Sequence, residues 1–184
     1  MTEDLTIRRL NAVEMDEWIA ALSHVPMDCV EGGASVSFMT PLTRQRADAF
    51  WIGIKDRVAV GTSELLIAEL EGDLVGTVQL IMAEPENQPH RADVAKMLVH
   101  RGARRRGIGR ALMNAAEDLA RAKGKTLLVL DTASDDAERL YRRQNWTVVG
   151  RVPGYALFPD GRPCDTTFFY KRLAPSSATI SRSD

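Results

Sequence analysis

A short segment rich in glycine and arginine follows an expected strand over residues 93–99 and opens an expected helix. A helix N-terminus presents N–H groups without intrahelical partners and the positive end of the helix dipole, so it attracts anions. Gly107 and Gly109 carry no side chain that would keep an anion from these groups. Five arginines surround them: Arg101, Arg104, Arg105, Arg106 and Arg110. The segment predicts a phosphate-binding site suited to a pyrophosphate.

The spacing of the glycines excludes two other phosphate-binding motifs. A dinucleotide fingerprint needs a third glycine where this chain has Leu112, and a P-loop needs Gly-Lys-Ser/Thr where this segment has Gly-Arg-Ala at 109–111. Arginine clustering alone is weak evidence, because a solvated helix entrance has the same composition. The order of strand, glycines and helix is what favours a phosphate site.

The N-terminal half of the chain supplies elements that can position this segment. Alternating apolar residues predict a strand over 5–10, and apolar residues at helical spacing predict helices near 15–22 and 47–58. Residues 30–39 contain two glycines and predict a loop. Two apolar runs around a Glu-Gly-Asp turn predict a hairpin over 64–82.

The C-terminal half continues the same alternation. The helix after Gly107 should end at Gly124, and a helix capped by Ser134 should end at Asn145. The remaining expected strands are 127–130, 146–149 and 166–173, the last two joined by a loop that holds Pro153, Gly154, Pro159, Asp160 and Gly161. We expect one α/β (α+β) domain over residues 1–173, with a mixed, mostly antiparallel sheet, and a flexible tail over 174–184.

Composition excludes several classes of protein. The 184 residues carry a formal net charge of −1, which argues against a nucleic-acid partner. The sequence has no apolar run long enough to span a membrane and no signal-like start, so we expect no membrane association and a cytoplasmic location. Cys29 and Cys164 are far apart and lack neighbours at metal-ligand spacing, so we expect neither a disulfide nor a metal.

Two blocks of residues resemble the GNAT superfamily of N-acetyltransferases. Residues 104–109 are similar to that family's Gln/Arg-x-x-Gly-x-Gly/Ala signature, and residues 137–141 with Asn145-Trp146 resemble a later helix and strand. The resemblance implies splayed central strands flanked by helices, and acetyl-CoA as co-substrate. The residues it implies for cofactor binding are Met97, Leu98, Val99, Arg104, Arg105, Arg106, Gly107, Ile108, Gly109, Arg110 and Ser134.

Within that implied cofactor site, the strand backbone at Met97 to Val99 would pair with the pantetheine arm, and an N–H near Val99 would meet the thioester carbonyl. Ser134 stands where many members of the family have an asparagine, which leaves its contact with the cofactor open.

Acetyl transfer to an amine requires acid–base groups. An alkylammonium has a pKa of about 10.4, so its nitrogen must lose a proton before it can attack an acyl group. Asp93 begins one expected strand and Asp131 ends its neighbour, which makes both candidates for the base, although either also suits a cap or turn. Tyr141 matches the tyrosine that commonly protonates the departing thiolate in this family, although it also continues an apolar stripe. Which aspartate is the base is left open.

A closer resemblance within the family is to the tabtoxin-resistance acetyltransferases. It depends on residues 31–39, 91–99, 130–132, 153–155 and 159–161. It implies an amino-acid-like or toxin-like acceptor and a resistance function. The residues suggested for binding the acceptor are Glu31, Gly32, Gly33, Ser35 and Arg91, and Arg91 could bind a carboxylate of the acceptor. Glu31 and Arg91 also suit ordinary solvated loop charges.

Other interpretations are kept alongside this one. A non-catalytic acyl-CoA sensor would use the same phosphate site without the acid and base. An acetyltransferase acting on protein N-termini or polyamines would differ only in the acceptor. A nucleic-acid binder would use the arginines at the helix entrance, against the near-neutral net charge. The assembly, a homodimer included, is left open.

Overall fold

The computed structural model describes residues 4–174, so the expected tail lies, after its first residue, outside the described residues. In this part of the chain the strands are β1 (Leu5–Leu10), β2 (Ser63–Leu70), β3 (Asp73–Met82), β4 (Arg91–Val99), β5 (Leu127–Thr132), β6 (Thr147–Leu157) and β7 (Pro163–Arg172). The helices are α1 (Ala12–Glu31), α2 (Arg44–Ala59), α3 (Ile108–Ala122), α4 (Asp135–Arg143) and the 3₁₀ helix η1 (Arg101–Ala103). The expected order of elements is confirmed.

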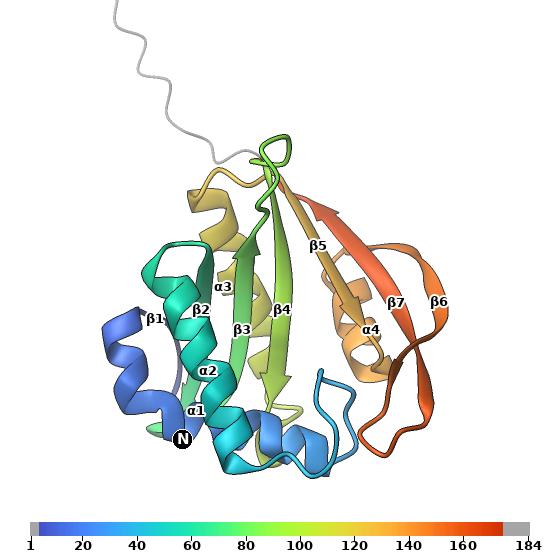
Figure 1. Cartoon of the computed structure of the whole chain (residues 1–184). Coiled ribbons are helices and arrows are strands. Elements are labelled where there is room, and N and C mark those ends of the chain that lie inside the picture. Colours follow the sequence, from blue (N-terminus) through green and yellow to red (C-terminus); the bar gives the residue numbers. More distant parts are fainter. Residues whose placement is uncertain (1–3, 175–184) are drawn as a thin grey trace, which may run out of the picture.

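All described strands belong to one sheet, in the order β1-β2-β3-β4-β5-β7-β6. Every neighbouring pair is antiparallel except β4 and β5, which are parallel. These two strands pair only through Arg91–Asp93 and Leu127–Val129, and beyond these residues they diverge (Figure 1). We call this divergence the splay. It confirms the expected mixed, mostly antiparallel sheet with splayed central strands.

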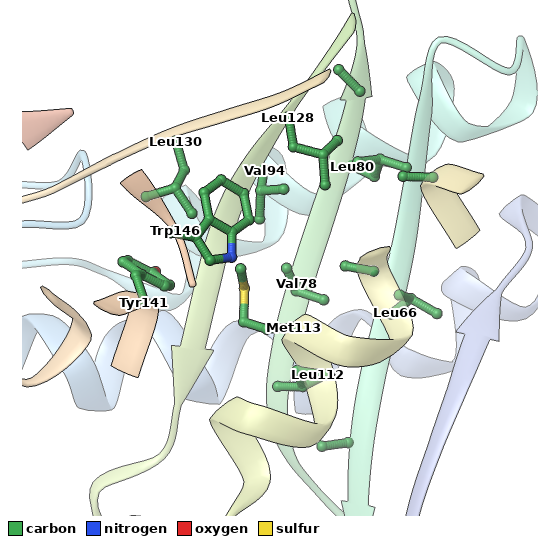
Figure 2. Close-up of a cluster of buried hydrophobic side chains, with 14 of the residues drawn as sticks. Leu66, Val78, Leu80, Val94, Leu112, Met113, Leu128, Leu130, Tyr141 and Trp146 are labelled. Carbon is green, nitrogen blue, oxygen red and sulfur yellow. The ribbon is translucent and has the colours of Figure 1, made fainter. Parts of the chain in front are cut away.

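The helices cover both faces of the sheet because successive residues of its central strands are apolar on both faces. On β2, Leu65 and Ile67 pack with residues of α1 and α2, whereas Leu66 packs with residues of α3. Leu112 and Met113 of α3 are fully buried among side chains of β2 to β5 (Figure 2). Full burial of one such side chain stabilises the fold by about 2 kcal/mol relative to its exposure.

The expected loop between the strands 146–149 and 166–173 is wrong at both ends, because β6 continues to Leu157 and β7 begins at Pro163. Pro153 and Gly154 lie within β6, which continues to Leu157. The register of β6 against β7 shifts between Val152 and Ala156, and the Gly154 N–H donates to the Asp165 carboxylate at 2.9 Å. A proline and a bulge are tolerated here because β6 is the edge strand, whose outer N–H groups need no partner in the sheet.

A buried carboxylate ties α3 to the last strands. Glu117 is 4% exposed and accepts hydrogen bonds from Trp146 Nε1 at 3.1 Å and Lys171 Nζ at 2.6 Å. We expect Glu117→Ala to lower the free energy of unfolding by about 3–5 kcal/mol, because it leaves a buried ammonium without its partner. Urea unfolding followed by circular dichroism measures this loss.

The double variant Glu117→Leu/Lys171→Met serves as the control. It removes both charges together, so it should be clearly more stable than Glu117→Ala. Equal stability of the two variants would contradict the assignment of the loss to an unpaired buried charge.

Candidate functional site

The glycine- and arginine-rich segment forms the turn into α3. Gly107 precedes the helix with a φ of 79°, and among the described residues no side chain caps the helix. The first intrahelical bond joins the Ala111 N–H to the Gly107 carbonyl at 3.0 Å. The N–H groups of Ile108 to Arg110 therefore lack intrahelical acceptors and can receive an anion.

Gly107 and Gly109 are required for different reasons. At Gly107 an added Cβ would meet no described atom within 4 Å, so its constraint is the left-handed backbone. At Gly109 an added Cβ would lie 3.1 Å from Leu140 Cδ2 and 3.6 Å from Met97 Sδ. Gly109 thus allows α3, α4 and β4 to approach one another, which the sequence did not indicate.

The five arginines do not act as one cluster. Arg101 binds α1 instead, with Nε 2.8 Å from Asp28 Oδ1 and a terminal nitrogen 2.6 Å from Glu31 Oε2. Arg104 folds back, and its Nε donates to the Val99 carbonyl at 3.2 Å. Arg105, Arg106 and Arg110, which flank the start of α3 in the sequence, are exposed to solvent.

The β4 strand carries a bulge inside the splay. Thr77 of β3 pairs with Leu98 and Gln79 with Ala95, so Lys96 and Met97 together face Val78. The Thr77 hydroxyl donates to the Lys96 carbonyl at 2.9 Å, which holds the bulge. The segment from Met97 to Val99 therefore borders the splay along an edge that β5 does not pair, as a pantetheine arm would require.

Asp93 and Asp131 lie on the same face of the two central strands. Asp93 pairs with Val129, the last paired residue of β5, and Asp131 follows two positions later. Arg91 forms an ion pair with Asp93. Burial raises the pKa of Asp131, Lys96 opposes this shift and Asp93 adds to it. Among the described residues, the Asp131 carboxylate forms no ion pair, which leaves it available as a proton acceptor.

Tyr141 is both a core residue and a neighbour of Asp131. It is 4% exposed and lies beside Trp146 in the core (Figure 2). Its ring packs against Trp146 and Phe169 with centroid distances of 6.0 and 5.7 Å. Burial raises the pKa of its hydroxyl, and the charge of Asp131 adds to this shift. The hydroxyl is therefore protonated at neutral pH and can donate a proton.

Ser134 is used by the fold itself. Its hydroxyl accepts the Ala137 N–H at 3.3 Å and caps α4, as expected from the sequence. Whether it also contacts a cofactor stays a prediction.

The residues suggested for acceptor binding lie in three places. Glu31 pairs with Arg101, and a Cβ on Gly32 would lie 2.6 Å from Arg101 Cδ, so both lie against η1. Ser35 donates to the Leu157 carbonyl at 2.7 Å, near the exposed Gly33. Arg91 lies beside Asp93. Their role in binding an acceptor stays a prediction.

Two features of the site were missed from the sequence. Lys96 lies near Asp131. The one sequence feature that could have indicated it is a lysine within an otherwise apolar part of the strand. The loop between α1 and α2 also reaches across the splay to the β6–β7 loop, where the Thr40 N–H donates to the Pro159 carbonyl at 3.1 Å. The two loops lie side by side in Figure 1. No local pattern indicates such a contact between distant segments.

A cavity of about 460 Å³ lies elsewhere, along the second half of α1. Its lining includes His24, Asp28, Glu31 and His100, and neither the two aspartates nor Tyr141. The candidate acid and base residues, and not this cavity, define the candidate site. Within residues 4–174, no three His, Cys, Asp or Glu side chains are grouped to hold a metal, and no helix has the length and apolarity of a membrane span.

Known proteins share both the sequence pattern and the fold. An uncharacterised N-acetyltransferase from the hisH–hisA intergenic region of Azospirillum brasilense is 28% identical over 130 residues, which is 70% of this chain and 75% of the relative. The structure is similar to that of YncA from Salmonella typhimurium with its cofactor acetyl-CoA, with a TM-score of 0.74, 21% identity and coverage of 96% and 98% of the two chains.

A third similar protein is a phosphinothricin acetyltransferase from Sinorhizobium meliloti, solved in complex with acetyl-CoA. Its TM-score is 0.75 at 18% identity, with 98% of this chain and 97% of the other covered. None of these three is described as a tabtoxin-resistance enzyme, so that closer resemblance stays a prediction. The model of the acetyltransferase (GNAT) family matches residues 31–146, which include the splay, the turn into α3 and Tyr141. The chain therefore belongs to the acetyltransferase (GNAT) family.

Proposed function

We propose that this protein moves an acetyl group from acetyl-CoA to the amine of a small acceptor. The observation that carries the proposal is the uncapped start of α3 behind the left-handed Gly107, directly beyond a strand whose edge is unpaired. These features suit the pyrophosphate and the pantetheine arm of coenzyme A. Two similar proteins are described with acetyl-CoA, which supports the same cofactor here.

The acid and base have separate roles in this proposal. Asp131, or Asp93 in its place, takes a proton from the acceptor ammonium, directly or through water. The amine nitrogen then forms a bond to the thioester carbonyl carbon, and the carbon–sulfur bond breaks. The protonated hydroxyl of Tyr141 gives its proton to the departing thiolate, and the second proton lost by the nitrogen returns to the Tyr141 oxygen, directly or through water, which leaves the neutral amide. A backbone N–H near Val99 stabilises the carbonyl oxygen as it gains charge.

The acceptor is proposed to be amino-acid-like or toxin-like. The Asp131 carboxylate, which forms no ion pair among the described residues, can attract an ammonium group into the splay. The resemblance to tabtoxin-resistance enzymes supports this choice, and so does the similarity to a phosphinothricin acetyltransferase. Polyamines and protein N-termini are the alternative acceptors, and an acyl-CoA sensor is the non-catalytic alternative.

A thiol-release assay tests the proposal. The purified protein is mixed with acetyl-CoA and, separately, with free amino acids, amino acid amides, polyamines and peptides with free N-termini. Release of thiol together with mass-spectrometric detection of the N-acetyl product would support it. Tight binding of coenzyme A without release for any amine would favour the sensor instead.

Tyr141→Phe tests the role of the hydroxyl. We expect kcat to fall by about 10²-fold, the low end of what one positioned proton donor contributes. The melting temperature should change little, because phenylalanine keeps the packing on Trp146 and Phe169. Steady-state kinetics and thermal unfolding separate the two effects. An unchanged kcat would show that the thiolate leaves without help from Tyr141.

A further inference from the structure

Lys96 occupies an unusual place on β4. Its φ of 48° is in the left-handed region, which a residue with a side chain rarely adopts. The ammonium of Lys96 contacts Ser37 of the α1–α2 loop and Phe50 of α2. These contacts show that the bulge places the Lys96 side chain on the face where Asp93 and Asp131 lie. Residues held in such conformations cluster at functional sites.

The ammonium of Lys96 is held without a carboxylate. It donates to the Ser37 hydroxyl at 2.8 Å and lies 5.6 Å from the centre of the Phe50 ring. Burial lowers its pKa, while the charge of Asp131 opposes that shift. Among the described residues, Lys96 forms no ion pair with Asp131, and Asp93 is already paired with Arg91.

Other lysines of the chain contrast with Lys96. Three of them have a carboxylate partner: Lys55 with Asp16, Lys123 with Glu64, and Lys171 with Glu117. Holding a cation partly out of water without a counter-charge is unfavourable. The unpaired ammonium beside the splay is therefore suited to an anionic ligand.

The side chains near Lys96 in the splay could bind the other parts of an anionic ligand, such as a positively charged amine. Asp131 is unpaired and lies directly opposite Phe168 in the β5–β7 register. Tyr155 packs edge-on against Phe168, with a centroid distance of 5.2 Å. The splay thus presents one cation and one anion, flanked by the rings of Phe50 and Phe168.

We infer that Lys96 binds the carboxylate of the acceptor while the acceptor's amine is directed to Asp131, so the enzyme selects amino acids with a free carboxylate. This inference rests on the proposed function and names the acceptor class more narrowly. The sequence suggested Arg91 for the contact with the acceptor carboxylate, and the inference assigns this contact to Lys96 instead. The Arg91 guanidinium already pairs with Asp93 and donates to the Gln88 side chain.

The test compares free L-amino acids with their α-carboxamides in the thiol-release assay. We expect the wild type to prefer the acid of each active pair. Lys96→Met keeps an aliphatic chain on Phe50 but loses the charge, and should raise KM for the acid roughly 10- to 100-fold, the worth of a hydrogen bond to a charged group. Its KM for the amide and for acetyl-CoA should change less than about twofold.

Two further variants make the test specific. Lys96→Arg should restore most of the preference for the acid, because it restores the positive charge. Lys125→Met is the matched control, since Lys125 also lacks a carboxylate partner within the described residues but lies before β5, with Nζ 2.7 Å from the Pro89 carbonyl. It should leave the preference unchanged.

The outcomes separate the inference from the proposed function. Absence of turnover with every amine would overturn the proposed function and the inference with it. Turnover in which the wild type treats acid and amide alike would overturn the inference alone. So would a Lys96→Met variant that loses activity equally on both, because that result is expected if Lys96 only holds the Ser37 loop.

Discussion

Replacing Gly107 by leucine is expected to weaken coenzyme A binding by at least about 100-fold, or roughly 2.7 kcal/mol. The leucine side chain would enter the space in front of the α3 N–H groups, which no described atom fills. Leucine would also resist the φ of 79° that aims these groups outward. Isothermal titration with coenzyme A measures the loss.

Gly124→Leu is the matched control at the other end of α3. Gly124 has a φ of 71°, and an added Cβ would again meet no described atom within 4 Å. This variant should have a similar cost in folding stability, because a left-handed conformation costs a non-glycine residue about 1–2 kcal/mol. It should bind coenzyme A normally. Retained binding by Gly107→Leu would show that the turn does not hold the pyrophosphate.

Replacing Asp131 by asparagine should lower kcat by about 10²- to 10³-fold, within the range attributed to a general base. Asparagine has nearly the same shape but cannot accept the proton. In the wild type, kcat should fall as the pH drops through the pKa of Asp131, because the protonated carboxyl is no longer a base. Burial raises that pKa, so the fall should begin above the ordinary value of 3.8. A pH–rate profile under saturating acetyl-CoA measures both effects.

Asp93→Asn identifies which aspartate is the base. The Asp93 carboxylate is already engaged in an ion pair with Arg91, whereas Asp131 forms none among the described residues. We therefore expect a smaller loss of kcat than for Asp131→Asn. If Asp93→Asn had the larger effect and removed the acidic limb of the profile, the base would be Asp93. Coenzyme A binding should stay normal in both variants.

Much of the site could be predicted because it depends on neighbours in sequence. The turn at Gly107, the N-cap at Ser134 and the left-handed helix ends at Gly124 and Asn145 are set by interactions over a few residues. Glycine conformation and side-chain caps act at this range, so residue type and spacing predict them. The same reasoning failed at Pro153, because it could not tell that β6 is an edge strand.

Only the tertiary structure decided which residues act together. Arg101 binds Asp28, which is 73 positions away, and Lys96 binds Ser37, which is 59 positions away. Gly109 is required because Leu140 of α4 packs against it. The bulge that sets the direction of the Lys96 side chain arises only when β3 pairs with β4. The sequence by itself therefore determined the turn at Gly107 and the candidate acid and bases, whereas sheet order and strand register determined that Lys96 lies near Asp131.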